Sequence, residues 1–260
     1  MIQIKTLLLS RIDKSPGISG MLSKVKQLKY SIPHILTLIN ASCGFLAIIK
    51  SIEGDIVTAA YYILVAAVLD GCDGRLARAL NCSSTFGGEL DSLADAMSFC
   101  SAPMVLMYCW MPEKWMFGVS CFLSLYVCAG LWRLAKFNTF MSDKNHFIGL
   151  PTTVAASTLA LLILYEPWMV LHADAVLRAP CLIALVMMLG YLMMSPIIFT
   201  KLNRYKCARI RDKVCVGTIF IMCAAAHITG FPLLFFLLVF YILLSVILFV
   251  RQFLIGKYSL

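Results

Sequence analysis

One stretch of the chain reads Ala59-Ala-Tyr-Tyr-Ile-Leu-Val-Ala-Ala-Val-Leu69 and continues directly into Asp70-Gly-Cys-Asp-Gly-Arg-Leu-Ala-Arg78. The next apolar run opens on a similar segment, Gly87-Gly-Glu-Leu-Asp-Ser-Leu-Ala-Asp95. A long apolar run predicts a membrane-spanning helix, because a helix satisfies its own backbone groups in lipid. Carboxylates at the ends of such helices are costly and mark a functional site. The stretch therefore predicts a membrane protein with an acidic site.

The composition of the 260-residue chain agrees with a membrane protein. Hydrophobic residues make up 61% of it and charged residues 13%, and its mean hydropathy is +0.89. Soluble domains are about 45–50% apolar and about 25% charged. One soluble core cannot hide this excess, so a water-soluble enzyme, a disordered chain and a disulfide-stapled secreted domain are excluded. The 11 cysteines are scattered without metal-ligand spacing, which indicates free thiols.

Apolar segments recur along the chain and predict an all-α, polytopic helical bundle with eight spans. They lie at 32–50, 56–80, 92–110, 115–138, 149–165, 179–200, 214–229 and 231–250. If the N-terminus is cytoplasmic, every Lys and Arg except Lys50, Lys114 and Arg178 lies on the cytoplasmic side. The positive-inside rule therefore predicts that both termini are cytoplasmic. We expect residues 1–30 to form a cytoplasmic, interfacial segment and residues 31–260 to form one transmembrane domain.

The net charge of +9 has a simple explanation in such a protein. Basic residues collect in cytoplasmic loops, where they contact anionic lipid. We therefore expect membrane lipids, and not nucleic acid, as partners of the basic segments.

Four aspartates form two pairs, each on one helix face. Asp70 and Asp73 are three residues apart, and Asp91 and Asp95 are four apart. A short turn through 79–88 can place the two helices antiparallel and bring the four carboxylates into one cavity near the cytoplasmic surface. Such a cluster needs a cation. Oxygen ligands without nearby Cys or His favour Mg²⁺, Mn²⁺ or Ca²⁺ over zinc or copper.

Small and basic residues accompany the aspartates. Gly74 and Ala77 lack bulk, so a ligand or a facing helix can approach the backbone, and Arg78 is placed to meet a phosphate. Two alternatives explain the acids differently: salt bridges to Arg75 and Arg78, or a cation or proton pathway in a transporter. Transporters place coupling charges near the membrane midplane and often contain repeats, whereas these acids lie at the membrane edge and no repeat is visible.

The spacing of eight residues resembles the signature of the CDP-alcohol phosphatidyltransferase family. These residues are Asp70, Asp73, Gly74, Ala77, Arg78, Gly87, Asp91 and Asp95. The resemblance covers residues 31–200. It extends to the phosphatidylserine synthase branch through the segments 81–99, 133–138 and 147–153. The chain departs from the family pattern at His34, where Asn is usual after proline, while Pro33, Thr37 and Asn40 match.

The resemblance implies that a phosphatidyl group is transferred from CDP-diacylglycerol to an alcohol and that CMP is released. The four aspartates would bind a divalent metal, Mg²⁺ or Mn²⁺. Asp91 and Asp95 would be catalytic, with Asp95 as the general base. The nucleotide would contact a further set of residues, which are Thr37, Asn40, Gly74, Ala77, Arg78, Ser84 and Gly87.

The acceptor implied by this branch is L-serine, and we expect Arg133, Asn138 and Thr152 to contact it. For Arg133, the alternative role is that of an interfacial anchor. Another alcohol (glycerol 3-phosphate or inositol phosphate), an archaeal ether-lipid donor and, outside this class, cation transport stay open. The resemblance further implies a homodimer in a bacterial inner membrane, with its active site on the cytoplasmic side.

Overall fold

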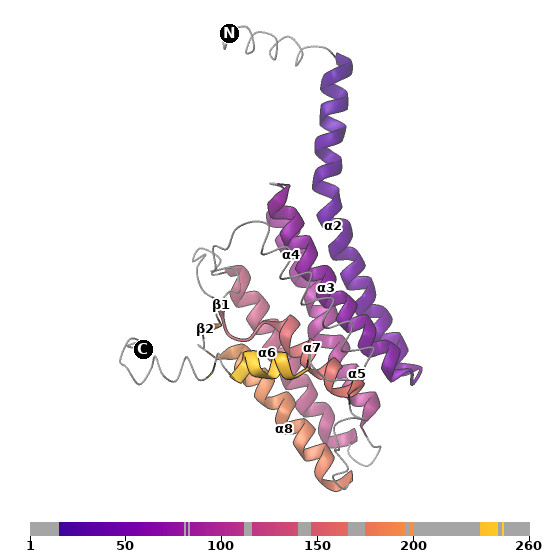
Figure 1. Cartoon of the computed structure of the whole chain (residues 1–260), viewed down its shortest axis with the longest axis vertical. Helices are drawn as coiled ribbons and strands as arrows, with labels where there is room; N and C mark the ends of the chain where they lie inside the picture. Colours follow the sequence, from indigo (N-terminus) through magenta and orange to yellow (C-terminus); the bar gives the residue numbers. More distant parts are fainter. Residues whose placement is uncertain are drawn as a thin grey trace, which may run out of the picture.

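The computed structural model describes residues 16–80, 82, 84–111, 116–139, 147–165, 175–195, 198–199, 235–243 and 246. These residues are mainly helical, with one pair of very short strands (Figure 1). The elements are α2 (Pro16–Ile52), α3 (Ile56–Ala79), α4 (Thr85–Asp95), the π-helical turn η1 (Ala96–Ser101), α5 (Ala102–Trp110), α6 (Met116–Thr139), β1 (Phe147–Ile148), α7 (Thr152–Leu164), α8 (Ala175–Met194) and β2 (Ile198–Phe199). A further helical segment lies at 235–243.

Four helical stretches are long and apolar enough to cross a membrane. They are Ser31–Ile52, Ile56–Ala79, Thr85–Trp110 and Gly118–Thr139, while Thr152–Leu164 and Pro180–Met194 are apolar but shorter. The predicted helical fold is confirmed, whereas the count of eight spans and the position of the termini stay predictions. Residues 1–15 and the predicted span 214–229 lie outside the described residues, as does 231–250 apart from 235–243 and 246.

Two observed boundaries differ from the predicted ones for a physical reason. The third span begins at Thr85 and not at residue 92, because Ser84 caps the helix by accepting a hydrogen bond from the Gly87 N–H at 3.0 Å. α8 ends at Met194, and β2 then pairs antiparallel with β1, with Phe147 opposite Phe199. This strand pair is a small exception to the all-α prediction.

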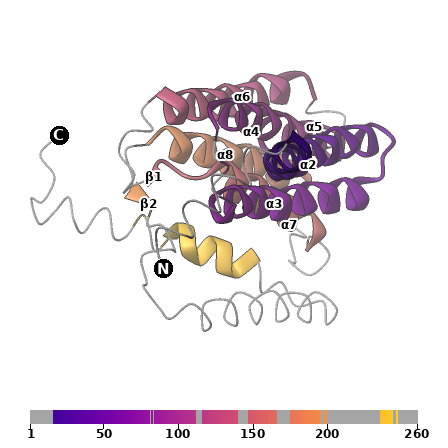
Figure 2. The ribbon, with the colours of Figure 1, turned by 90° about the horizontal axis from the view of Figure 1, so that it is seen from above.

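The described helices form one bundle. α2 packs along α3 and along the continuous rod of α4, η1 and α5; α6 packs against α8, and α7 against α3 and η1. Figure 2, seen from above, shows these helices gathered around one another. Ala59, Ala60 and Ala66 of α3 are fully buried, and such small residues let helices approach closely in a membrane. Nearly all of α7 is buried, because it is apolar on every side.

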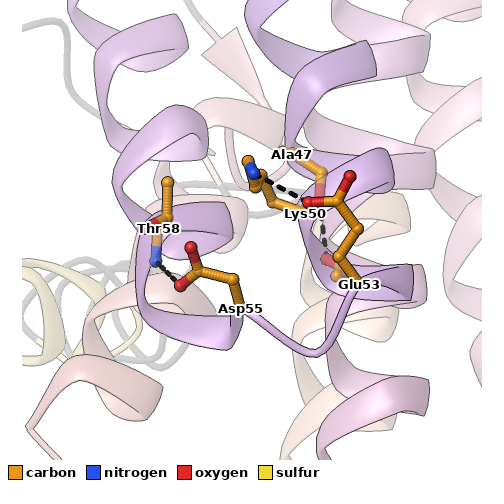
Figure 3. Close-up of polar contacts among 6 residues, drawn as sticks. Ala47, Lys50, Glu53, Asp55 and Thr58 are labelled. Carbon is orange, nitrogen blue, oxygen red and sulfur yellow. Dashed lines mark hydrogen bonds and ion pairs between the residues drawn. The ribbon is translucent and has the colours of Figure 1, made fainter.

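The turn between α2 and α3 is closed by polar contacts (Figure 3). Lys50 Nζ pairs with Glu53 Oε2 at 2.7 Å, and Asp55 caps α3 by accepting from the Thr58 N–H at 3.2 Å. Hydrogen bonds from Thr58 hold the pKa of Asp55 below its usual value. Gly54 has a φ of 83°, a left-handed conformation that suits glycine. These contacts fix the end of α3 that lies away from its two aspartates.

Candidate active site

Three of the four predicted carboxylates meet in one cluster. Asp70 comes from α3, and Asp91 and Asp95 come from α4, one helical turn apart. One carboxylate oxygen from each of the three lies within 4.8 Å of the others. The i, i+4 spacing places Asp91 and Asp95 on one face of α4, and the turn between α3 and α4 brings Asp70 to the same place. We call these three residues the acidic cluster.

Asp73 is held at a different place from the acidic cluster. Its side chain is 4% exposed, and its Oδ2 accepts a hydrogen bond from Thr37 Oγ1 of α2 at 2.9 Å. The Thr37 hydroxyl also lies 3.1 Å from the Pro33 carbonyl of its own helix. Asp73 and Thr37 therefore join α3 to α2 beside the cluster, and Asp73 is not one of the three carboxylates that converge.

The first turn of α7 reaches both the acidic cluster and a buried cation. Thr153 Oγ1 donates to Asp70 Oδ2 at 3.1 Å. Thr152 Oγ1 accepts from Arg133 Nη1 of α6 at 3.2 Å. Arg133 is only 9% exposed, and its Nε has no hydrogen-bond partner among the described residues. Two neighbouring threonines thus connect a guanidinium on one side to a carboxylate on the other.

Gly149 places this turn of α7. Its φ is 85°, and a Cβ at this position would collide with the Met193 carbonyl oxygen near the end of α8. The next residue, Leu150, donates its N–H to the Leu192 carbonyl at 3.0 Å. The start of α7 is therefore fastened to the end of α8, which fixes the position of the two threonines.

The acidic cluster contains buried oxygens that no protein donor satisfies. Asp91 Oδ1 and Asp95 Oδ1 are buried and have no hydrogen-bond partner among the described residues. Burial of charged oxygens without a partner is costly. A hard divalent cation prefers oxygen ligands of this kind. The donor set of Asp70, Asp91 and Asp95 therefore fits a divalent metal ion.

The described residues do not support the alternative in which Arg75 and Arg78 form salt bridges with the aspartates. Arg75 and Arg78 are exposed, and the ion pair found among the described residues joins Lys50 to Glu53. The four aspartates are thus not neutralised by arginines at the end of α3. The buried guanidinium of Arg133 is the nearby positive charge, and one such charge does not balance three carboxylates.

Of the residues expected near the nucleotide, three surround the end of α3. A Cβ on Gly74 would lie 3.8 Å from Arg78 Nη1, so the Arg78 side chain extends along the open backbone of Gly74. Ala77 is half-buried, and its carbonyl accepts the Cys82 N–H at 2.9 Å, which closes the turn after α3. The backbone at Gly74 and the guanidinium of Arg78 are therefore on the surface beside Asp73.

Two other expected nucleotide residues form the start of α4, where His34 covers them. Ser84 Oγ lies 3.4 Å from His34 Nε2, and the His34 ring meets the Phe86 ring edge-on with centroids 5.5 Å apart. A Cβ on Gly87 would lie 3.0 Å from His34 Nε2. Gly87 therefore permits the close approach of α2 to α4. The residue that departs from the family pattern packs on the first turn of α4.

Asn40 lies deeper than a surface contact to a nucleotide would require. It is fully buried, and neither atom of its side-chain amide has a partner among the described residues. Its backbone carbonyl accepts a hydrogen bond from Ser98 Oγ of η1 at 3.0 Å. Asn40 therefore fastens α2 to the π-helical turn that follows Asp95. Turns of this type are frequent at functional sites.

Asn138 of α6 is expected at the acceptor, and its side-chain amide forms hydrogen bonds with two residues of α4. Asn138 Nδ2 donates to Glu89 Oε2 at 3.2 Å, and Asn138 Oδ1 accepts from Ser92 Oγ at 3.0 Å. Glu89, Ser92 and Ser98 lie in segment 81–99, and Thr153 lies in segment 147–153, both of which carry the family resemblance. The hydrogen-bond partners of these side chains depend on contacts between helices, so only the tertiary structure reveals them.

Comparison with known proteins gives consistent matches. The family model described as CDP-alcohol phosphatidyltransferase matches residues 30–192. A protein of Helicobacter pylori named CDP-diacylglycerol–serine O-phosphatidyltransferase is 31% identical over 180 residues, which cover 68% of this chain and 75% of that protein. A protein of the same name from Mycobacterium tuberculosis is 36% identical over 132 residues, 48% of this chain. The alignment covers less than half of that longer relative, 46%.

An archaeal protein is also similar. The archaetidylserine synthase of Methanothermobacter thermautotrophicus is 34% identical over 132 residues, which cover 50% of this chain and 56% of that protein. Serine thus occurs in the names of relatives from Bacteria and from Archaea.

Proposed function

Because this chain belongs to the CDP-alcohol phosphatidyltransferase family, we propose that it transfers the phosphatidyl group of CDP-diacylglycerol to the hydroxyl of L-serine. The products are phosphatidylserine and CMP. The observation that carries the proposal is the acidic cluster, whose three carboxylates lie within 4.8 Å of one another beside the buried Arg133. The names of the relatives support serine as the acceptor.

The acidic cluster, with Asp73 beside it, would hold a divalent metal, for which we propose Mg²⁺ or Mn²⁺. When bound, such an ion neutralises the diphosphate of the donor and stabilises the departing CMP. Asp73 is kept in place by the hydroxyl of Thr37. Gly74, Arg78 and the capped first turn of α4 would provide open backbone and a guanidinium for the nucleotide. Thr37 contacts Asp73, and Ala77 closes the turn after α3, whereas Asn40 contacts η1.

Asp95 is proposed as the general base. The serine oxygen attacks the phosphorus that bears the diacylglycerol, and the bond between that phosphorus and the CMP oxygen breaks. CMP leaves with the electron pair, and Asp95 takes the proton of the serine hydroxyl. A carboxylate that accepts this proton as the bond forms is needed because the hydroxyl itself is weakly acidic. Asp91 lies on the same face of α4, one turn before Asp95.

Arg133 and Thr152 are proposed to receive the serine carboxylate. The guanidinium is nine-tenths buried, its Nε is unpartnered among the described residues, and Thr152 holds its Nη1. A planar guanidinium suits bidentate contact with a carboxylate. The first turn of α7 connects Arg133 to Asp70 of the acidic cluster, so a serine carboxylate held at Arg133 would place the serine hydroxyl near the cluster that contains Asp95. Nothing tests the sequence prediction that Asn138 contacts the acceptor directly, and the contacts of its amide with Glu89 and Ser92 favour a different role.

The test is CMP release by the purified protein with a panel of acceptors. We expect release with L-serine and none above background with ethanolamine, glycerol 3-phosphate or inositol phosphate. Release that depends on one of the phosphorylated alcohols would refute serine as the acceptor. The archaeal relative supports a second donor, so CDP-diacylglycerol is compared with its ether-linked counterpart. The family match favours transfer chemistry over cation transport.

We further propose a multi-pass protein of a bacterial inner membrane, with the active site at the cytoplasmic surface and a homodimer as the working form. The four apolar helices support membrane insertion. The cytoplasmic position of the site rests on the distribution of Lys and Arg. Chemical cross-linking of the protein in native membranes tests the dimer. Recovery of the protein only as an uncross-linked monomer would refute it.

A further inference from the structure

The amide of Asn138 is occupied at both ends by α4. Asn138 lies near the end of α6, and its Nδ2 donates to Glu89 Oε2 at 3.2 Å while its Oδ1 accepts from Ser92 Oγ at 3.0 Å. A carboxylate only accepts hydrogen bonds, so the amide nitrogen must face Glu89. The Ser92 hydroxyl also lies 3.1 Å from the Gly88 carbonyl of its own helix. One side chain of α6 thus forms hydrogen bonds with two residues of α4.

This contact is a polar link between two helices that touch each other over a small area. α4 packs more extensively on α2, and α6 packs more extensively on α8. α4 carries Asp91 and Asp95, and α6 carries Arg133 one and a half turns before Asn138. The separation between the base and the guanidinium therefore depends on how α4 lies against α6. The Asn138 amide is the polar contact that sets this relation at the end of α6.

We propose that Asn138 is a positioning residue for serine transfer, acting through Glu89 and Ser92 and not by contact with the substrate. The inference rests on the proposed function, since it concerns the alignment of Asp95 with Arg133. Loss of the link would disturb serine use more than CDP-diacylglycerol binding, because the donor site also has contacts from α2 and α3, whereas the proposed serine contact, Arg133, lies on α6 itself. The larger effect would therefore be on serine use.

The test exchanges the donor and the acceptor of the hydrogen bond between Asn138 and Glu89. Asn138→Asp places a carboxylate opposite Glu89, which removes the donor and adds repulsion, while the contact from Ser92 persists. Glu89→Gln keeps an acceptor for Asn138 and removes a charge. In the double variant the new amide at 89 donates to the new carboxylate at 138, so the bond is restored in the reverse direction.

We expect Asn138→Asp to lower kcat/KM for serine roughly 5- to 30-fold, which corresponds to a change of about 1–2 kcal/mol. Glu89→Gln should stay within about twofold of the wild type, and the double variant should recover most of the loss, with smaller changes in KM for CDP-diacylglycerol than in kcat/KM for serine. A serine ligand would behave differently, because Glu89→Gln cannot return a lost donor to the substrate. A double variant as impaired as Asn138→Asp would overturn the proposal.

Thermal unfolding in detergent supplies a second readout for the same four proteins. The unfolding midpoint should fall in Asn138→Asp and recover in the double variant. If Asn138→Asp does not fold, Asn138→Ala and Glu89→Ala replace it; non-additive losses in kcat/KM for serine support the link, and additive losses overturn it. Wild-type protein without serine-dependent CMP release would instead refute the proposed function, whereas active wild type without rescue refutes the link alone.

Discussion

Asp95 combines burial with an unsatisfied oxygen. It is 9% exposed, its Oδ1 has no hydrogen-bond partner among the described residues, and it belongs to the acidic cluster. An acceptor left in this condition is costly unless a ligand completes it. The proposed ligands are the metal ion and the serine hydroxyl. Asp95 is therefore the side chain whose chemistry is hardest to replace.

Asp95→Asn keeps the shape of the side chain but removes its negative charge and its capacity to take a proton. We expect the rate of serine-dependent CMP release to fall about 10²–10⁴-fold, the usual loss for a general base. Asp55→Asn, at the opposite end of α3, is the control and should retain the wild-type rate. Near-native release by Asp95→Asn would show that another group takes the proton.

Arg133 should determine the serine requirement. Arg133→Lys keeps a positive charge but loses the bidentate geometry of the guanidinium and its contact with Thr152. Hydrogen bonds to charged groups contribute about 1.5–3 kcal/mol, so KM for serine should rise roughly 10–100-fold. Steady-state kinetics with each substrate varied separately give the comparison, and Lys136→Ala, an exposed change on the same helix, is the control. An unchanged serine dependence would leave Arg133 as an interfacial anchor.

The π-helical turn η1 is held between two helices that approach it through glycine. A Cβ on Gly44 of α2 would lie 2.6 Å from Ser98 Cα, and a Cβ on Gly130 of α6 would lie 2.5 Å from Cys100 Sγ. Both contacts are with residues just beyond Asp95. The close packing of α2 and α6 on η1 therefore fixes the end of α4 from two sides.

Gly44→Ala should destabilise the protein although alanine is the better helix former. The new methyl group meets the backbone of Ser98, which cannot move aside, and overpacking of this kind costs about 1–3 kcal/mol. Gly118→Ala is the matched control, since nothing lies within 4 Å of a Cβ at Gly118. It should keep or raise the unfolding midpoint in detergent. Equal midpoints for the two variants would contradict the close packing.

The helices with strong apolar runs could be predicted from the sequence, whereas their ends and local irregularities could not. The predicted spans 32–50 and 56–80 coincide closely with Ser31–Ile52 and Ile56–Ala79. The early start of α4 depends on a cap at Ser84, and the strand pair depends on where α7 and α8 end. The π-helical turn leaves no periodic signal. These features result from contacts between segments, which a local pattern does not contain.

The acidic cluster could be predicted because its spacing is a local property of a helix. The separate place of Asp73 could not, since it depends on Thr37 of another helix. Likewise, Thr153 reaches Asp70 only because α7 is fastened to α8. The sequence predicts that Asn138 contacts the acceptor because it lies on the same side of the membrane as the aspartates. The structure shows that its amide forms hydrogen bonds with α4.

The distribution of Lys and Arg predicts the orientation of the protein in the membrane. A cytoplasmic C-terminus follows from an even number of spans and the positive-inside rule. Green fluorescent protein fused after Leu260 should fluoresce, and alkaline phosphatase fused there should be inactive. The same phosphatase placed after Lys114, which lies outside the described residues, should be active. The reverse pattern would show that the termini and the acidic cluster face the other side.

The metal requirement of phosphatidylserine formation tests the proposed chemistry most directly. Purified protein receives CDP-diacylglycerol and isotopically labelled L-serine, and the label in the lipid fraction is measured. We predict incorporation with Mg²⁺ or Mn²⁺, none above background in excess chelator, and recovery when metal is restored, because the acidic cluster binds the ion that neutralises the diphosphate. Undiminished incorporation in excess chelator would contradict the assignment of Asp70, Asp91 and Asp95 as a metal site for this reaction.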